Sequence, residues 1–387
     1  MTSLVHSGRL GRLLNITHLE PVGYYHFAHS YVRGNWKAEG TSAPIVLTKS
    51  SHDIDIFCKW LWPLVPSKVS SFAGLGHFRK ERKPEGAEGV TRCLECPGNI
   101  ESRCEYSAKK SALTHSFHLL RLADISSVYL SRVQSGHLYW PVSVIVDGTP
   151  TVESVTKALE ETDYGLCVYE SANDVPDNQT ISMQFTSPEP PLVPGSNAHL
   201  PAINPTINFT IVAHTSSICM RQTRLHFEHG EVIGDMSTYT ISDFRNPGRQ
   251  AEQIVPRYVR GGHGGGDTGL MRAWLKAVRE KEGMEWAPAD QPGWDDFYPE
   301  QEGGEIVPGE REHGPLGYSS SVRDQLRVFL TGFAIEEARR QGRVVDCEEF
   351  TSRALEEYRA ERSGGTGEGL KSDLAPAARP KVTIELV

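Results

Sequence analysis

Residues 24–36 read YYHFAHSYVRGNW, and His52-Asp53-Ile54-Asp55 begins sixteen residues after that stretch ends. Three histidines, an arginine, an asparagine and several aromatic rings therefore gather near the start of the chain. Histidine suits proton transfer near neutral pH, arginine and asparagine can hold hydroxyl or carboxylate groups, and aromatic faces can cover a sugar-like ring. A structural interpretation is also open, in which Tyr25, Phe27 and Tyr31 form a strand core. As a substrate site, the stretch offers these contacts: Tyr24, His26, His29, Arg33, Asn35 and Trp36.

His52 lies at the start of a predicted helix. Ser50 and Ser51 can cap this helix by accepting its first free amide hydrogens. A helix N-terminus disfavours the imidazolium ion and so lowers the pKa of His52, which keeps a base available. Lys49 could serve as a donor, so His52 and Lys49 are the candidate catalytic residues; alternatively, His52 and Asp53 only cap the helix. The apolar helical face that follows contains Ile54, Phe57, Cys58 and Leu61.

The rest of the chain predicts an α+β fold with an open, mostly antiparallel sheet and helices packed on one face. β-branched and aromatic residues recur between turn residues, and most connections are too short for crossover helices. Apolar stripes predict two further helices across one face of the sheet, one from residue 267 to 278 and one from 322 that stops at Gly342. The predicted strands cover residues 10–22, 44–48, 69–75, 166–170, 180–186, 206–214, 223–228 and 237–244.

The length of 387 residues allows one large domain or two modest ones. We expect one folded body over residues 1–362 and a mobile tail over residues 363–387, where the composition is polar and Gly-rich. Long irregular insertions are expected at about 76–112, 187–205 and 282–317.

Charge and composition exclude several function classes. A formal net charge of −9 and a pI near 5.9 argue against a general nucleic-acid partner, which requires basic surface. No run approaches 18 apolar residues, so no membrane span is expected. No signal peptide is visible, and seven cysteines, an odd number, fit a reducing compartment. We therefore expect a cytoplasmic protein.

Cys93, Cys96 and Cys104 suggest a metal site, because a Cys-x-x-Cys turn supplies two thiolates and zinc takes four soft or borderline ligands. The spacing does not select the fourth ligand, for which Cys58, His77 and His115 are candidates. The alternative is that these thiols pack in an irregular loop without metal.

The segments 18–36 and 47–55 resemble the C-terminal domain of the Gfo/Idh/MocA family of NAD(P)-dependent oxidoreductases. The resemblance continues through 93–110, 165–170, the turn at 230–235 and the loop at 263–271, and it covers about residues 7–350 with interruptions. It implies a domain with an open, largely antiparallel sheet that partners an N-terminal Rossmann domain. Hydride passes in that family between nicotinamide and a sugar, inositol or related polyol.

By this resemblance His52 matches the family's active-site histidine, which is proposed to move the hydroxyl proton. The family's aspartate four residues earlier falls at Thr48, which removes the carboxylate expected to orient the base and leaves Lys49 as the nearest replacement. Asp55 and His263 lie in two matching segments and are also predicted to contact substrate.

The family's Gly-rich cofactor fingerprint and Glu-Lys-Pro motif belong upstream of Met1. The GxGxxG at 264–269 lacks the strand–helix–strand context of a dinucleotide site. We therefore expect that this chain alone binds neither NAD nor NADP and is not a dehydrogenase by itself. The resemblance predicts the substrate-binding and oligomerisation domain of a sugar or polyol oxidoreductase, working as a homo-oligomer or with a Rossmann-domain partner. Alternatives are a non-catalytic polyol-binding or assembly module, and part of an NAD-dependent glycoside hydrolase.

Overall fold

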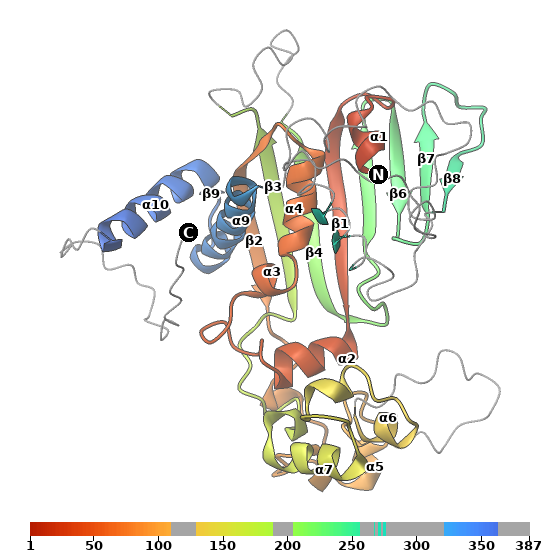
Figure 1. The fold of residues 1–387 in the computed structure, drawn as a ribbon, viewed down its shortest axis with the longest axis vertical. Coiled ribbons are helices and arrows are strands. Elements are labelled where there is room, and N and C mark those ends of the chain that lie inside the picture. The colour runs from red at the N-terminus through yellow and green to blue at the C-terminus, as the bar shows by residue number, and fades with distance from the viewer. Residues whose placement is uncertain are drawn as a thin grey trace.

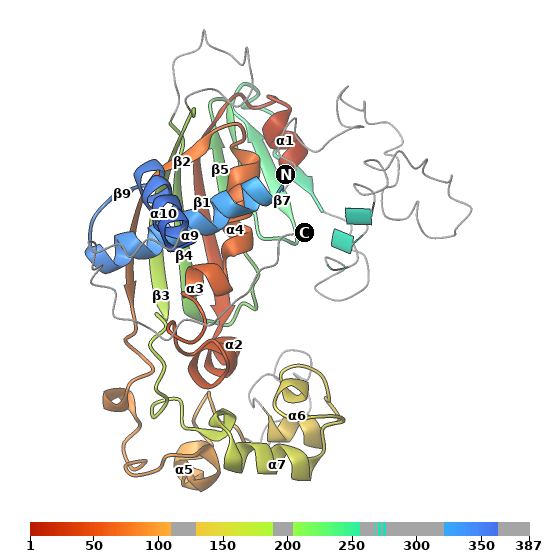
Figure 2. The same cartoon turned by 60° about the vertical axis from the view of Figure 1, so that its left-hand side comes forward.

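A computed structural model describes residues 1–109, 129–188, 204–255 and 321–362, together with 267, 270, 271, 274 and 275. A large sheet with helices on one face forms one end of the molecule, and a smaller, mainly helical lobe hangs from the other end (Figures 1 and 2). We call this second part the small lobe; its described residues are 24–36, 76–109 and 129–176. No helix among the described residues is long and apolar enough to cross a membrane.

The described strands form one nine-stranded sheet in the order β8-β7-β6-β5-β1-β4-β3-β2-β9. All neighbours pair antiparallel except β1 and β4, which are parallel. The predicted open, mostly antiparallel sheet is therefore confirmed. The strands are β1 (Leu13–Gly23), β2 (Val65–Gly74), β3 (Asn178–Thr186), β4 (Thr206–Thr215), β5 (Gln222–Phe227), β6 (Gly230–Gly234), β7 (Tyr239–Asp243), β8 (Glu252–Ile254) and β9 (Val345–Asp346).

Helices α3, α4 and α9 cover one face of the sheet (Figure 2). Helix α10 extends outward beside α9 (Figure 1). The short helices α2, α5, α6 and α7 belong to the small lobe. The helices are α1 (Thr2–His6), α2 (Tyr24–Phe27), the π-helix η1 (Ala28–Arg33), α3 (Ile45–Thr48), α4 (Ser51–Trp60), the 3-10 helices η2 (Lys80–Arg82) and η3 (Cys93–Glu95), α5 (Gly98–Glu101), α6 (Leu130–Gln134), the 3-10 helix η4 (Val142–Val144), α7 (Val152–Glu161), the 3-10 helix η5 (Asp163–Gly165), α9 (Val322–Gln341) and α10 (Cys347–Arg362).

The core lies between the sheet and these helices. Ile16 on β1 pairs with Ile207 on β4 and Leu225 on β5, and all three side chains are buried. Side chains alternate across the sheet, so the opposite face presents the intervening residues. On the central strands this opposite face is polar and exposed, and its residues include Thr17, Thr180, Ser182, Asn208 and Arg224.

Helix α9 was predicted from its apolar stripe, and its end at Gly342 is confirmed by the left-handed φ of 63° there. The prediction that this apolar stripe packs on the sheet was wrong, because its residues Val322, Phe329 and Phe333 are exposed. The helix instead buries a face that mixes small residues with Val328 and Ile335. A Cβ placed on Gly332 would lie 2.3 Å from Leu47 Cδ2. Close approach of α9 to α3 therefore requires a glycine at this position.

Three other predictions of local structure are corrected. Residues 44–48 form α3, not a strand, because the amides of Leu47 and Thr48 both donate to the Pro44 carbonyl. Residues 166–170 contribute one isolated bridge, Leu166 with Arg92, and no strand. Residues 230–234, interpreted as a turn, form strand β6 between β5 and β7.

The predicted helix from residue 267 to 278 falls mostly outside the described residues. Residues 110–112 and 189–203 of the first two expected insertions, the whole insertion at 282–317 and the tail at 363–387 also lie outside them. The described residues of that segment are helical, and Leu270, Met271 and Trp274 are exposed. Residues 76–109 are irregular as expected, with only η2, η3 and α5 as short helices. The small lobe has an apolar cluster of its own, which includes Cys93, Tyr129, Val142, Val155 and Leu159.

Candidate functional site

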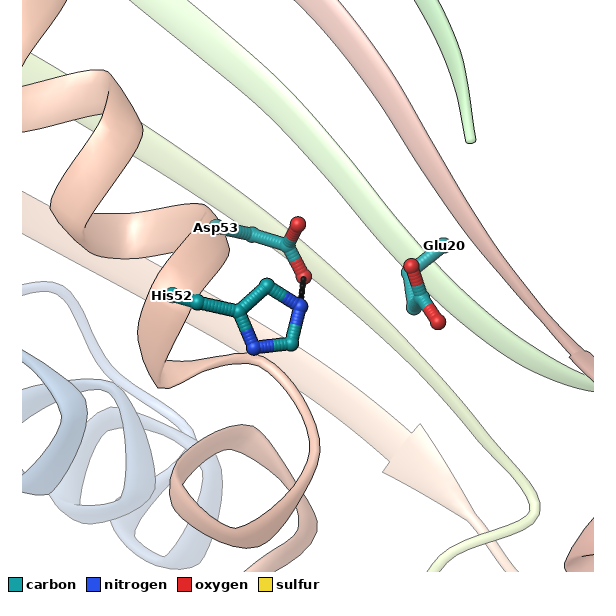
Figure 3. Close-up of side chains that lie close together, drawn as sticks. All are labelled: Glu20, His52 and Asp53. Carbon is teal, nitrogen blue, oxygen red and sulfur yellow. Dashed lines mark ion pairs between the residues drawn. The ribbon is translucent and has the colours of Figure 1, made fainter. Parts of the chain in front are cut away.

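A cluster of charged side chains lies where β1, the start of α4 and the start of β5 meet. β1 supplies Glu20, α4 supplies His52 and Asp53, and Arg221 stands one residue before β5. Figure 3 shows the Asp53 carboxylate beside the His52 ring, with Glu20 facing both from the neighbouring strand. Ligand atoms of Glu20, His52 and Asp53 all lie within 4.8 Å of one another.

Arg221 neutralises the two buried carboxylates of this cluster. Its Nε donates to Asp53 Oδ1 at 2.7 Å and forms an ion pair with Glu20 Oε2 at 3.0 Å. Both carboxylates are almost fully shielded from solvent. A buried carboxylate is costly unless an opposite charge compensates it. Glu20 and Asp53 therefore both depend on the guanidinium of Arg221 for their stability in the fold.

His52 is the member of the cluster that solvent reaches, with 55% of its side chain exposed. Its Nε2 accepts a hydrogen bond from the Arg221 guanidinium and lies 3.4 Å from Asp53 Oδ2. With Nε2 as acceptor, the ring proton of the neutral imidazole sits on Nδ1. Partial burial lowers the pKa of His52, and the charges of Arg221 and Lys49 lower it further against the opposing effect of Asp53. The ring is therefore neutral at pH 7.

Asp53 is ionised throughout the neutral range. Burial alone would raise its pKa, but hydrogen bonding to His18 and the charges of His52 and Arg221 outweigh it and lower the pKa to about 2. His18 Nε2 lies 3.4 Å from Asp53 Oδ1, and its Nδ1 contacts the Thr223 hydroxyl at 2.9 Å. His18 thus supports Asp53 from inside the sheet.

A polar chain continues from this cluster to the small lobe. Lys49 Nζ lies 3.4 Å from Glu20 Oε1 and donates to Cys219 Sγ at 2.9 Å. Cys219 adopts a left-handed φ of 56°, and its sulfur lies 3.7 Å from His26 Nδ1. Burial, reinforced by the charge of Lys49, lowers the pKa of His26 to about 4. His26, Cys219, Lys49, Glu20 and Arg221 thus form one continuous series of contacts that ends at His52.

The donor set of Glu20, His52 and Asp53 has the residue types of a metal site but does not fit a cation. Arg221 already contacts both carboxylates, and Lys49 approaches Glu20 from another side. A divalent ion at this position would face two fixed positive charges at close range. The guanidinium occupies the position that a metal would otherwise take.

The structure brings three predicted site residues together, namely His26, Lys49 and His52. The carboxylates near His52 come from Asp53 and Glu20, while Thr48 turns its hydroxyl to the Pro44 carbonyl. Lys49 therefore contacts a carboxylate but does not replace the missing one. The capping prediction is corrected in part: α4 begins at Ser51, but the Ser50 side chain makes no capping hydrogen bond.

The other predicted contacts lie elsewhere. His29 is 2% exposed and bonds the Tyr129 hydroxyl at 2.8 Å, and Arg33 is 1% exposed inside the small lobe, so solvent-borne substrate has no direct access to either. Asp55 faces α9, where it accepts from Gln325 at 2.9 Å. Tyr24 packs against Tyr25 and Tyr106, Asn35 and Trp36 are exposed, and His263 lies outside the described residues.

Sequence reasoning missed Glu20, Arg221 and Cys219 as parts of the site. A signal for Glu20 exists, because His18 and Glu20 share the strand face of the apolar Ile16, and polar residues at core positions need partners. No comparable signal marks Cys219 and Arg221, which come from a connection between strands some 170 residues further along the chain.

No protein-family profile matches the sequence, and no curated protein matches it. Several solved structures are similar at low identity. Levoglucosan dehydrogenase in complex with NADH and levoglucosan is 10% identical, with 89% of this chain and 62% of that chain covered and a TM-score of 0.44. A super-repressor mutant of Gal80p from Saccharomyces cerevisiae is 10% identical over 90% of this chain and 61% of that chain, with a TM-score of 0.43.

An oxidoreductase from Agrobacterium radiobacter, solved with NAD+, L-tartaric acid and magnesium, is 10% identical over 90% of this chain and 60% of that chain, with a TM-score of 0.42. The chain thus spans about three fifths of the length of these structures. Similarity at this level does not establish an activity for this chain.

Proposed function

We propose that this chain is the substrate-binding part of a sugar or polyol oxidoreductase, with His52 as the group that accepts the substrate's hydroxyl proton. The observation that carries the proposal is the position of His52: a solvent-accessible imidazole whose Nε2 accepts a hydrogen bond from Arg221 beside the Asp53 carboxylate. Burial lowers the pKa of this imidazole and so favours its neutral form. A base for alcohol oxidation needs this combination of access and neutrality.

His52 Nε2 is the basic nitrogen in this arrangement, because the ring proton sits on Nδ1. A substrate hydroxyl that takes the place of the Arg221 N–H at Nε2 transfers its proton there, and Arg221 remains on Asp53 and Glu20. Asp53 then lies 3.4 Å from the new positive charge and stabilises it. Glu20, Asp53 and Arg221 are thus positioning residues, and so is Lys49, which contacts Glu20 and Cys219. His52 is the residue that contacts the substrate.

Oxidation of an alcohol carbon also requires a hydride acceptor, which a nicotinamide cofactor supplies when bound. Among the described residues the sheet has one parallel pair, β1 with β4, and no strand–helix–strand unit of the dinucleotide-binding kind. The proposal therefore assigns substrate binding and proton transfer to this chain, and nicotinamide binding to a Rossmann domain outside these residues.

Ligand-detected NMR with a panel of hexitols, inositols and aldoses tests the substrate class. We expect saturable binding whose Kd rises about tenfold in His52→Asn. This change corresponds to about 1.4 kcal/mol, the contribution of the one hydrogen bond that the substitution removes. His229→Asn is the matched control, since His229 is exposed at the turn between β5 and β6. Binding that His52→Asn leaves unchanged contradicts the site.

One observation favours a second function, that of a non-catalytic polyol-binding module. The Arg221 guanidinium donates a hydrogen bond to His52 Nε2 and so keeps this basic nitrogen occupied in the absence of substrate. The two functions differ in chemistry. The measurement follows reduction of NAD+ or NADP+ by a bound polyol after a nicotinamide-binding domain has been supplied. Reduction by the wild-type chain that is lost in His52→Asn supports the oxidoreductase. Polyol binding without any such reduction supports the binding module.

A further inference from the structure

Four cysteines line one small cavity of about 30 Å³ in the small lobe: Cys93, Cys96, Cys104 and Cys167. They come from separate segments. Cys93 opens η3, Cys96 follows it, Cys104 comes after α5, and Cys167 follows η5. The three remaining cysteines lie elsewhere in the fold, since Cys58 and Cys347 belong to the core under the sheet and Cys219 to the polar chain near His52.

Backbone pairing holds the distant Cys167 against the other three. Leu166 forms a β-bridge with Arg92, and the Cys167 amide donates to the Thr91 carbonyl at 2.8 Å. The Cys96 amide donates to the Cys93 carbonyl at 3.3 Å, which forms the turn of the Cys-x-x-Cys segment. The fourth thiol at this cavity is therefore Cys167, and neither Cys58 nor His77 lines it. The third fourth-ligand candidate from the sequence, His115, lies outside the described residues.

Arg33 gives a second, independent observation that points to negative charge in this cavity. Its guanidinium is buried and forms no ion pair with an aspartate or glutamate among the described residues. One donor contacts Cys93 Sγ at 3.1 Å, two others reach the carbonyls of Leu166 at 2.7 Å and Tyr106 at 2.9 Å, and Nη1 has no hydrogen-bond partner within the described part of the chain.

A buried guanidinium without a counter-charge is strongly unfavourable, because burial removes its hydration. Neutral thiols do not compensate it. Four thiolates around a divalent cation carry a net charge of −2, which makes them a counter-ion for Arg33, and the N–H···S contact to Cys93 is the kind of outer hydrogen bond that accompanies metal-bound sulfur.

We propose that Cys93, Cys96, Cys104 and Cys167 bind one divalent ion of the zinc class as a closed, four-thiolate structural site. Each thiol releases its proton to solvent, four metal–sulfur bonds replace the bonds of the ion to water, and no electron is transferred. In tetrahedral coordination at about 2.3 Å the sulfurs lie about 3.8 Å apart. The four sulfurs lie farther apart than this in the structure. Among the described residues, only Glu20, His52 and Asp53 bring three potential ligand atoms within 4.8 Å of one another. Rotation of the thiol side chains therefore accompanies binding.

The metal–sulfur bonds would connect the segment that contains η3 and α5 to the residues that follow η5. These segments are irregular, and the apolar cluster of the small lobe, to which Cys93 belongs, is small. A metal that binds only the folded lobe stabilises it by mass action. This inference does not depend on the proposed polyol function.

The test is the metal content of the full chain purified in reducing buffer, with X-ray absorption at the metal edge. We expect about one zinc ion per chain, with four sulfur ligands at about 2.3 Å. Cys167→Ser should lose the metal or bind it at least tenfold more weakly. Cys219→Ser is the matched control, because Cys219 is half-buried like Cys96, Cys104 and Cys167, and it should retain the metal.

Because Cys167→Ser can fail to fold, a second measurement uses the metal-free wild-type chain. Addition of Co²⁺ should give the visible absorption bands and thiolate charge transfer of a tetrahedral cobalt–sulfur centre. The proposal is overturned if the reduced wild-type chain takes up neither zinc nor cobalt, if bound metal has oxygen or nitrogen ligands only, or if Cys219→Ser and Cys167→Ser lose metal equally.

Discussion

At the scale of single residues, the site depends on one guanidinium that serves two buried carboxylates. Among the described residues, Arg221 is the only one whose side chain forms ion pairs with both Glu20 and Asp53, and it also donates a hydrogen bond to His52. Neither carboxylate has room to gain hydration without a change in the packing of β1 and α4, because both are buried. The same residue therefore sets the stability of this junction and the state of the imidazole.

We predict that Arg221→Met lowers the free energy of unfolding by about 3 to 5 kcal/mol, because it leaves two buried carboxylates without their shared cation. Urea denaturation at neutral pH measures this change. Arg224→Met on β5 is the control: its guanidinium is half exposed and 4.0 Å from Glu231, so its removal should cost less than 1 kcal/mol. Equal effects of the two substitutions would show that the buried pairs contribute no more than a surface pair.

His29 predicts a dependence of stability on pH. Burial, followed by the charges of His26 and Arg33, lowers its pKa to about 3 in the folded chain. The unfolded chain, in which the pKa is near 6.5, binds the extra proton first, so the contribution of His29 is complete above pH 6.5 and is lost as the pH falls toward 3. In that range this histidine removes up to about 1.4 kcal/mol of stability per pH unit.

His29→Gln keeps a hydrogen-bonding side chain near Tyr129 but cannot take up the proton. The slope of unfolding free energy against pH, measured by urea denaturation between pH 6.5 and 4.5, should therefore be shallower in His29→Gln than in the wild type. Identical slopes in the two proteins would mean that His29 is not held neutral by the fold.

At the scale of elements, the sequence predicts where most strands and helices occur but not always which side of a helix is buried. Helix α9 begins at the capping pair of Ser321 and Asp324 and ends at Gly342, and both signals can be read from the chain. The buried face could not be read, because it mixes small and polar residues with Val328 and Ile335, and the close contact at Gly332 is with Leu47, whose position depends on α3. Residues 44–48 were misassigned for a related reason: β-branched residues there favour a strand, but Pro44 starts a turn of helix.

Gly332 packs too closely against Leu47 to accept a side chain. Gly332→Val should lower the free energy of unfolding by about 1 to 3 kcal/mol, because its side chain would overlap Leu47 and push α9 away from α3. Thermal and urea denaturation both report this loss. Phe329→Ala on the exposed side of the same helix should change stability by no more than about 0.5 kcal/mol. The reverse order of the two effects would mean that the large apolar stripe, and not the small-residue face, packs on the sheet.

At the scale of the whole molecule, the sheet has one covered face and one exposed face. The exposed face is continuous but polar on its central strands, where Asn208 lies between Thr17 and Ser182 in the strand register. On these strands the face is therefore not an apolar association surface. We propose that self-association, if it uses this face, rests on hydrogen bonds between polar side chains.

Asn208→Arg tests this proposal, because a two-fold interface would bring two copies of the new positive charge close together. Sedimentation velocity should show an oligomer for the wild-type chain and monomer for Asn208→Arg. Val144→Arg, an exposed position in the small lobe, should keep the wild-type state. A wild-type monomer, or an oligomer that Asn208→Arg does not change, would contradict the proposal.

The candidate site could be predicted in part from the sequence for a physical reason. His52 and Lys49 flank a helix start that is visible in the chain, and Glu20 lies at a core position of a predicted strand. Arg221 and Cys219 join them only through the pairing of β5 with β1, and Cys167 joins the other three cysteines only through its bridge to residues 91 and 92. Such long-range contacts leave no local pattern.

The most direct test of the central claim is an NMR titration of the His52 imidazole, assigned by comparison with His52→Asn, in the absence and presence of a bound polyol. We predict that the midpoint of the free chain lies below pH 6.5, because burial and Arg221 disfavour the imidazolium, and that the polyol shifts the ring signals and their midpoint. A midpoint at or above pH 6.5 that no polyol affects would contradict the assignment of His52 as the substrate's proton acceptor.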